Sequence, residues 1–341
     1  MQDSVIRLQN LSIGYQTSRK RKVVASPLNA SLNKGEMTCL LGANGTGKST
    51  LMRTICNFIP ALNGNILLND KLISKLSELD LARQISVVLT DKISIPNATL
   101  FELVAFGRSP FTGFLGKLTA EDKAIVNQSI ERCGIAHKKH DLISSLSDGE
   151  RQKATIAKAL AQNTPYILLD EPTAFLDLPA KVEIMQLLRT LASSGKSILM
   201  STHDLDLALQ MADRLWIINQ EKLIVGSPED LILENAFQDI FSKGGIIFDN
   251  KTGLFKIDYQ YSKTFKVKGH GFKYVLLRRA FSRKSISLEQ AVSEDENFIT
   301  INNKADKTFS LYINHQLFIE SNSIEEIVKN ACSPLNVKES Q

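Results

Sequence analysis

Cysteine is scarce in this chain of 341 residues, and its four cysteines lie far apart. No two of them form a Cys-x-x-Cys pair, so the sequence offers neither a common zinc motif nor a disulfide framework. We expect all four side chains to be small hydrophobic groups of the core. They are Cys39, Cys56, Cys133 and Cys332.

Long apolar runs are also absent. No stretch stays apolar for the roughly 18 to 20 residues that a membrane-spanning helix requires. The first residues, Met-Gln-Asp-Ser, lack the charged and then apolar layout of a signal peptide. We therefore expect a cytoplasmic protein.

Neither sign of charge is in strong excess. The chain has 41 basic and 36 acidic residues, for a net charge of +5. This balance is too mild to indicate nucleic acid, so we expect no nucleic-acid partner. With 43% hydrophobic and 23% charged residues, the composition is typical of a globular protein. The length allows one large domain with a small one, or two domains.

A glycine-rich loop follows an apolar run at residues 37–41 and precedes a helical pattern at residues 50–55. A random chain of this length would contain Gly-x-x-x-x-Gly-Lys-Ser/Thr roughly one time in a hundred. The order strand, glycine loop, helix predicts a phosphate-binding loop rather than a flexible surface loop, because glycines let backbone N–H groups turn toward phosphate oxygens. The expected nucleotide contacts are Gly42, Asn44, Gly45, Gly47, Lys48, Ser49 and Thr50.

Two apolar strands further along the chain end in polar residues. The strand at residues 166–169 leads into Asp170 and Glu171, and the strand at residues 197–202 leads into His203. Consecutive strand residues face opposite ways, so the two carboxylates need separate roles. Apolar strands that alternate with helices predict a largely parallel sheet, which binds ligands at the carboxyl ends of its strands.

Five motifs occur in a fixed order along the first 242 residues. They are the glycine loop, Leu-Ser-Asp-Gly-Glu at 146–150, Leu-Leu-Asp-Glu-Pro at 168–172, Leu-Asp at 176–177, and His203. This set resembles the ATPase subunits of ATP-binding cassette (ABC) transporters over residues 4–242. The resemblance implies a P-loop α/β fold with a nucleotide-binding domain at 1–243, which includes a helical subdomain at about 92–162. It also implies ATP and Mg²⁺ as ligands.

The resemblance assigns a role to each residue of the site. Asp170 and Ser49 would hold Mg²⁺, while Glu171 would orient and deprotonate the attacking water. His203 would sense the γ-phosphate. Tyr15 would stack on adenine, although a core tyrosine is the alternative. Lys48 would neutralise charge on the phosphates as the terminal phosphoryl group leaves.

The Leu-Ser-Asp-Gly-Glu motif has two interpretations. Ser147 and Glu150 have the spacing of a capping box, so the motif can simply start a helix that runs to about residue 162. In the family, the same motif lies across a dimer interface, where Ser147 and Gly149 would complete the nucleotide site of a second copy. One such motif and one glycine loop in the chain imply a head-to-tail homodimer.

Three departures from the family pattern stand out. The signature motif has Asp148 and Glu150 where Gly and Gln are usual, and Ala174 stands where a serine is common. The glutamine that normally follows the strand at 85–89 is missing. Thr90 takes its place, with Asp91 next. We expect one of these two residues to reach the metal through water.

The segment at residues 102–110 resembles the helical region of importers for iron–siderophore complexes, haem or cobalamin, and His-Asp-Leu-Asp-Leu-Ala at 203–208 fits the same group. This resemblance implies an integral-membrane permease and, indirectly, a substrate-binding protein as partners. The subunit would then be peripheral on the inner face of the cell membrane.

Two alternatives remain open at this point. A soluble ABC ATPase that acts in translation or on DNA would usually carry two such domains or a long coiled coil, and neither is present. Asn-Lys-Ala-Asp at 303–306 matches a guanine-reading pattern of GTPases, but a polar hairpin turn is the favoured interpretation because it lies far outside the nucleotide core.

After Gly244-Gly245 the sequence changes to short β-branched and aromatic strand patterns with two helical segments. This change predicts a small α+β domain at 246–341. Its predicted strands are 255–259, 265–268, 298–301 and 309–313, and its predicted helices are 272–281 and 324–331. Residues 263–284 include eight basic residues and no acidic one. A solvated helix face is the plain interpretation, and anionic headgroups or a partner subunit are the alternatives. We expect a regulatory or dimer-stabilising role.

Overall fold

The structure is a computed structural model that describes most of the chain in two compact units. The N-terminal unit comprises residues 1–240 and 249–254, and the C-terminal unit comprises residues 241–248 and 255–341. Thr90, Asp91, the predicted linker at 244–245 and the motif at 303–306 lie outside the described residues. The described residues are 4–18, 20–89, 95, 97–113, 116–237, 246–249, 254–292, 295–302 and 308–333.

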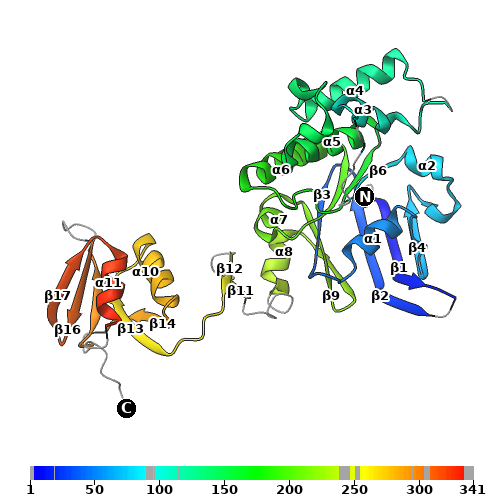
Figure 1. Ribbon diagram of the computed structural model, residues 1–341. Coiled ribbons are helices and arrows are strands. Elements are labelled where there is room, and N and C mark those ends of the chain that lie inside the picture. The colour runs from blue at the N-terminus through cyan, green and yellow to red at the C-terminus, as the bar shows by residue number, and fades with distance from the viewer. Residues whose placement is uncertain are drawn as a thin grey trace. The chain divides into compact units, whose positions relative to one another are not determined.

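A six-stranded sheet forms the centre of the N-terminal unit (Figure 1). Its order is β10-β9-β3-β8-β7-β6, and every pair is parallel except β9 with β10. The strands β3, β7 and β8 are buried along their whole length, as expected for a parallel sheet covered on both faces. The prediction of a parallel sheet is confirmed. The strands are β3 (Met37–Leu41), β6 (Ile85–Val88), β7 (Tyr166–Leu169), β8 (Ser197–Ser201), β9 (Arg214–Asn219) and β10 (Lys222–Gly226).

A second, antiparallel sheet has the order β2-β1-β4-β5. Its apolar side chains, among them Leu28 and Ile66, share one core with Leu40 and Leu168 of the parallel sheet and with Leu51 of the first helix. The phosphate-binding loop is therefore anchored in packed elements on several sides. The strands are β1 (Ser4–Gln16), β2 (Arg21–Asn33), β4 (Asn63–Leu68) and β5 (Lys71–Leu72).

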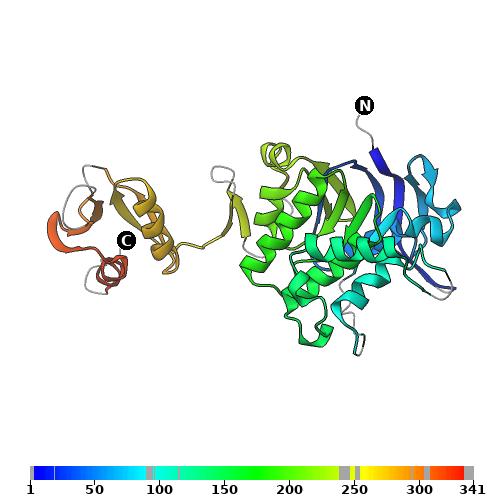
Figure 2. The same cartoon turned by 90° about the horizontal axis from the view of Figure 1, so that it is seen from above.

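Helices cover the sheets, and α3, α4 and α5 gather at one side of this unit in both views (Figures 1 and 2). Each of these three begins with a capping box, formed by Thr99, Thr119 or Ser147 with an acidic residue three positions later. After α3 the chain continues as a 3₁₀ turn at Phe106–Arg108. The helices are α1 (Lys48–Ile55), α2 (Glu78–Ala82), α3 (Leu100–Ala105), α4 (Ala120–Arg132), α5 (Asp148–Ala161), α6 (Leu178–Ser193), α7 (Leu205–Met211) and α8 (Pro228–Leu233).

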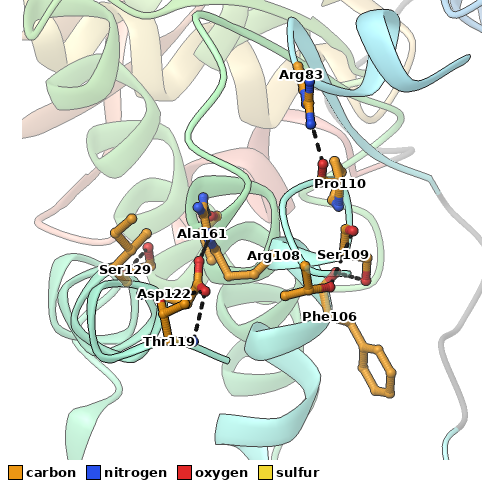
Figure 3. A network of polar contacts seen from close by, with 11 residues as sticks. Arg83, Phe106, Arg108, Ser109, Pro110, Thr119, Asp122, Ser129 and Ala161 are labelled. Atoms are coloured by element: carbon orange, nitrogen blue, oxygen red, sulfur yellow. Dashed lines mark hydrogen bonds and ion pairs between the residues drawn. The ribbon is translucent and has the colours of Figure 1, made fainter. Parts of the chain in front are cut away.

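The segment at residues 102–110 ties these three helices together (Figure 3). Arg108 is buried, lies 2.8 Å from the Asp122 carboxylate and donates to the Ala161 carbonyl at 3.0 Å. Its guanidinium also lies 4.2 Å from the centre of the Phe111 ring. An added Cβ at Gly107 would come within 2.2 Å of the Lys158 carbonyl oxygen. This segment therefore fixes α4 and α5 by close packing and a buried ion pair.

Replacing Arg108 by alanine is expected to lower the free energy of unfolding by about 3–5 kcal/mol, because it leaves the Asp122 carboxylate buried without its cation. Denaturant unfolding measures this change. Lys138→Ala is the control, since its pair with Asp141 at 3.4 Å is partly exposed and should contribute at most about 1 kcal/mol. Equally small losses of unfolding free energy in both variants would contradict a stabilising role for the buried ion pair.

The same pair makes a pH-dependent contribution to stability. Hydrogen bonds from the backbone and side chain of Thr119, and then from Arg108, lower the pKa of Asp122 to about 2. A lowered pKa contributes stability above the ordinary value of about 3.9 and loses it as the pH falls toward 2. Between those two pH values, the free energy of unfolding of Asp122→Asn should change less with pH than that of wild type.

The C-terminal unit contains a five-stranded sheet with the order β14-β13-β15-β16-β17. The helices α10 and α11 pack against one face of it, where Val267, Ile299 and Leu311 form the core with Leu277 and Ile327. A further pair of strands, β11 (Ile246–Asp249) and β12 (Leu254–Ile257), precedes this sheet. The remaining elements are β13 (Lys263–Lys268), α10 (Phe272–Ser282), β14 (Ile286–Gln290), β15 (Phe298–Ile301), β16 (Phe309–Ile313), β17 (Gln316–Ser321) and α11 (Ile324–Ala331).

Both predicted helices and the four predicted strands of this unit are present, but β11, β14 and β17 were not predicted. The buried face of α10 consists of Leu277, Ala280 and Phe281, whereas Phe272 is 74% exposed. Phe272, at the start of α10, therefore lies off the buried face of the helix. Among the described residues, no helix combines the length and hydrophobicity needed to cross a membrane.

Candidate functional site

The glycine loop joins the carboxyl end of β3 to the start of α1. Gly42 has φ 153, and a Cβ there would lie 2.7 Å from the Thr46 hydroxyl and 2.8 Å from the Ile218 carbonyl oxygen. Gly47 has φ 107 and caps α1 without any side-chain hydrogen bond, so the N–H groups of the first turn keep their capacity to bind an anion. Gly45 and Asn44 are on the exposed part of the loop.

Lys48 is buried and turned back into its own loop. Its Nζ donates to the carbonyl oxygens of Gly42 at 2.8 Å and Ala43 at 3.3 Å. Burial lowers the pKa of the Lys48 ammonium, while the nearby carboxylates of Glu171 and Asp170 act in the opposite direction. The structure thus brings the predicted lysine and both predicted carboxylates into one electrostatic environment.

Asp170 and Glu171 follow β7, and one hydroxyl group connects them. The Ser201 hydroxyl, at the end of β8, donates to Oδ1 of Asp170 at 2.6 Å and accepts the backbone N–H of Glu171 at 2.8 Å. Ser201 is fully buried. Ser201 was not among the predicted site residues, and the available signal was a hydroxyl at the carboxyl end of the strand beside β7.

Glu171 departs from ordinary backbone geometry. Its φ is 52, in the left-handed region that costs a non-glycine residue roughly 1–3 kcal/mol. The side chain of His203 reaches it, with Nε2 2.6 Å from Oε1. Thus the predicted base and the predicted sensor lie side by side, held by the ends of β7 and β8.

Tyr15 lies next to the first turn of α1. Its hydroxyl is 3.1 Å from the hydroxyl of Thr50, and its side chain is 47% exposed. This exposure does not fit the alternative of a core tyrosine. The adenine-stacking role stays a prediction.

Ser147 and Gly149 form the start of α5. The capping box is complete, since the Ser147 hydroxyl accepts from the Glu150 N–H at 3.2 Å and the Ser147 N–H donates to Oε2 of Glu150 at 2.9 Å. Hydrogen bonds from the Ser147 backbone and hydroxyl lower the pKa of Glu150. An added Cβ at Gly149 would meet only Ala180 Cβ, at 3.6 Å, which is ordinary contact. Nothing near Gly149 in the described chain requires a glycine there.

The arrangement suits phosphate binding and hydrolysis of a phosphoanhydride. β3, β8 and β7 are adjacent in the sheet, so the loop, His203 and the two carboxylates meet at one sheet edge. The hydroxyl of Ser49 and the carboxylate of Asp170 are hard oxygen donors, which fit Mg²⁺. Among the described residues, no group of three or more His, Cys, Asp or Glu side chains gathers around a separate metal position.

Comparison with known proteins decides the family. The profile of the ABC transporter family matches residues 25–174. An uncharacterised ABC transporter ATP-binding protein of Methanocaldococcus jannaschii is 37% identical over 265 residues, which cover 77% of this chain and 90% of the relative. This chain belongs to the ABC transporter ATP-binding family. It is therefore an ATPase subunit of the transporter type.

Two further relatives of this ABC subunit have named cargoes. The petrobactin import ATP-binding protein of Bacillus anthracis is 38% identical, with 63% of this chain and 79% of the relative covered. The iron(3+)-hydroxamate import ATP-binding protein of Bacillus subtilis is 35% identical, with 72% and 90% covered. A solved structure described as a metal-chelate type ABC transporter aligns with TM-score 0.62 and 26% identity, over 70% of this chain and 90% of that chain.

Replacing Ser201 by alanine is expected to lower the turnover number for ATP about 10- to 100-fold, as for other groups that hold ligands and bases in place. The reason is that Asp170 loses a donor and the Glu171 backbone loses its acceptor. ATP affinity should stay within a few-fold. Steady-state phosphate release gives both values, with Ser86→Ala in β6 as the control. An unchanged turnover number would show that Ser201 has no positioning role.

Proposed function

We propose that this subunit drives the import of an iron chelate, of the siderophore type, through a membrane permease. The observation that carries the proposal is the Glu171–His203 pair at the sheet edge beside the phosphate loop, in a chain whose relatives import petrobactin and iron(3+)-hydroxamate complexes. These named relatives favour transport over a soluble ABC ATPase. The subunit would be peripheral on the inner face of the cell membrane.

In this proposal each residue at the carboxyl edge of the parallel sheet has one role in binding or hydrolysing ATP. The loop N–H groups and Lys48 bind the phosphates, Tyr15 contacts the base, and Ser49 with Asp170 would hold Mg²⁺. When bound, the metal neutralises charge on the phosphate oxygens. Glu171 orients water and accepts its proton, and His203 holds the Glu171 carboxylate in place through its 2.6 Å contact.

The proposal also needs a second copy of the chain. No described residue near Gly149 excludes a side chain at this position. The value of a glycine there would therefore come from close approach of another molecule. The first turn of α5 offers N–H groups and the positive end of the helix dipole to a phosphate. A head-to-tail homodimer would place this turn against the nucleotide bound by the partner's loop.

We infer that the permease contacts a groove of about 650 Å³ in the N-terminal unit. Its wall includes the apolar side chains of Leu81 and Val87 and the partly buried Lys158 of α5, and Phe58 at the rim is 61% exposed. α5 begins at the signature motif and lines this groove near its other end. One rigid helix would therefore connect the permease to the nucleotide.

Uptake of radioactive iron as a hydroxamate complex tests the proposal in a strain that lacks this chain. Wild type should restore uptake, whereas Glu171→Gln should not. Phe58→Asp should also fail to restore uptake, while the purified variant hydrolyses ATP like wild type. If the strain without this chain kept its iron uptake but lost cobalamin uptake, the cargo would be reassigned. If that strain kept both, the importer assignment would be refuted.

A further inference from the structure

We propose that the C-terminal units of two chains pair face to face through the side of the five-stranded sheet that carries neither α10 nor α11. Both helices pack on the other face, in the core built from Val267, Ile299 and Leu311. Side chains alternate along a strand, so Phe298, Thr300 and Tyr312 belong to the opposite face. None of the described helices covers this face, which we call the open face.

The open face carries a row of registered residues across four strands, which begins with Lys266 on β13 and continues with apolar or aromatic side chains on β15, β16 and β17. Lys266 is registered with Phe298, Phe298 with Tyr312, and Tyr312 with Leu317. The rings of Phe298 and Tyr312 are stacked with centroids 4.7 Å apart, and Leu317 is 52% exposed. Leu317 therefore contributes exposed apolar surface at the β17 end of the row, whereas Phe298 is only 9% exposed.

A second, polar row runs beside the first. Lys268 is registered with Thr300, Thr300 with Ser310, and Ser310 with Glu320. The row thus has a cation on β13 and an exposed carboxylate on β17. Within one chain these charges do not meet, because three strand spacings of about 4.8 Å separate them.

The two rows are self-complementary under a twofold rotation. An axis parallel to the strands and midway between β15 and β16 places β13 of one copy over β17 of the other. It then places Phe298 over the other copy's Tyr312, and Lys268 over the other copy's Glu320. Aligned sheets pack in this way about 10 Å apart, within about 30° of parallel. A symmetric contact of this kind is isologous.

A second copy fits this face better than a nucleic acid does. Sheets that bind single-stranded RNA stack bases on exposed aromatic rings. Here Tyr312 covers one side of Phe298, and the Lys268 ammonium lies 3.8 Å from the centre of the same ring. Phe298 is only 9% exposed. The face is small, so we expect weak pairing that is strengthened because the ATPase units also associate.

A charge exchange tests the proposal on the full chain without nucleotide. Sedimentation of wild type should show self-association with a dissociation constant in roughly the micromolar range. Lys268→Glu and Glu320→Lys should each weaken it about tenfold or more. The double variant should recover to within a few-fold of wild type. Since Lys268 and Glu320 are not paired within one chain, this recovery requires a contact between chains.

Lys263→Glu is the matched control, because Lys263 belongs to the same strand but to the opposite face. It should associate like wild type, and all variants should retain ATP binding, which depends on the N-terminal unit. A wild type that stays monomeric at about 100 μM, or a double variant as weak as the single ones, overturns the proposal. Binding of an oligouridine probe that Lys268→Glu abolishes, without self-association, would assign the face to RNA instead.

Discussion

Glu171→Gln is expected to reduce ATP turnover by about 10²- to 10⁴-fold, the range that a positioned general base contributes. Glutamine has the same size and can keep the contact that Oε1 makes with His203 at 2.6 Å, but it cannot accept a proton. Binding of ATP should therefore be retained. Unhydrolysed ATP should then stay with the protein after free nucleotide is removed.

Phosphate release at saturating ATP measures this effect, and retained ATP is counted on a desalting column. Glu183→Gln is the matched control, because Glu183 is an exposed glutamate whose carboxylate pairs with Lys153 at 2.6 Å. It should leave turnover unchanged. If Glu171→Gln turned over like the control, another group would be the base.

Lys48→Ala is expected to remove ATP binding at ordinary concentrations. The ammonium is buried in the phosphate loop, and losing one partner of a desolvated charge pair costs about 2–5 kcal/mol, or roughly 30- to 4,000-fold in affinity. Titration with a fluorescent ATP analogue measures the dissociation constant in the absence of turnover.

Lys196→Ala is the control for this variant. Lys196 also has a pKa lowered by burial, and it donates to the Thr164 carbonyl at 2.6 Å. It directly precedes β8, at the opposite end of that strand from His203. Its loss should not change ATP affinity. Equal effects of the two substitutions would indicate general destabilisation rather than a phosphate contact.

The fold of the N-terminal unit and its family could be predicted from the sequence because their signals are local. The glycine loop stands between a strand and a helix, and the apolar strands at 166–169 and 197–201 are near-continuous runs with polar residues after them. Both strands lie in the parallel sheet where they were expected. Capping at Ser147 also follows from a spacing of three residues.

The side-chain contacts of the site and of the helical region could not be predicted, because the residues that form them are far apart in the sequence. Ser201 meets Asp170 across 31 positions, and Arg108 reaches the Ala161 carbonyl across 53. No spacing rule predicts such contacts. β17 was missed because its hairpin turns at Asn314 and His315, both with positive φ, where neither residue is glycine. β14 was missed because only two of its residues, Ile286 and Leu288, are apolar and buried.

The central claim is that one nucleotide site is built from two copies of the chain, and mixing two inactive variants tests it directly. Lys48→Ala removes the phosphate contact, and Gly149→Arg blocks the signature turn while its own loop stays intact. Each variant alone should not hydrolyse ATP. An equal mixture should recover up to about a quarter of wild-type turnover, because half of the dimers are mixed and each has one intact composite site. A mixture as inactive as its components would contradict the shared site.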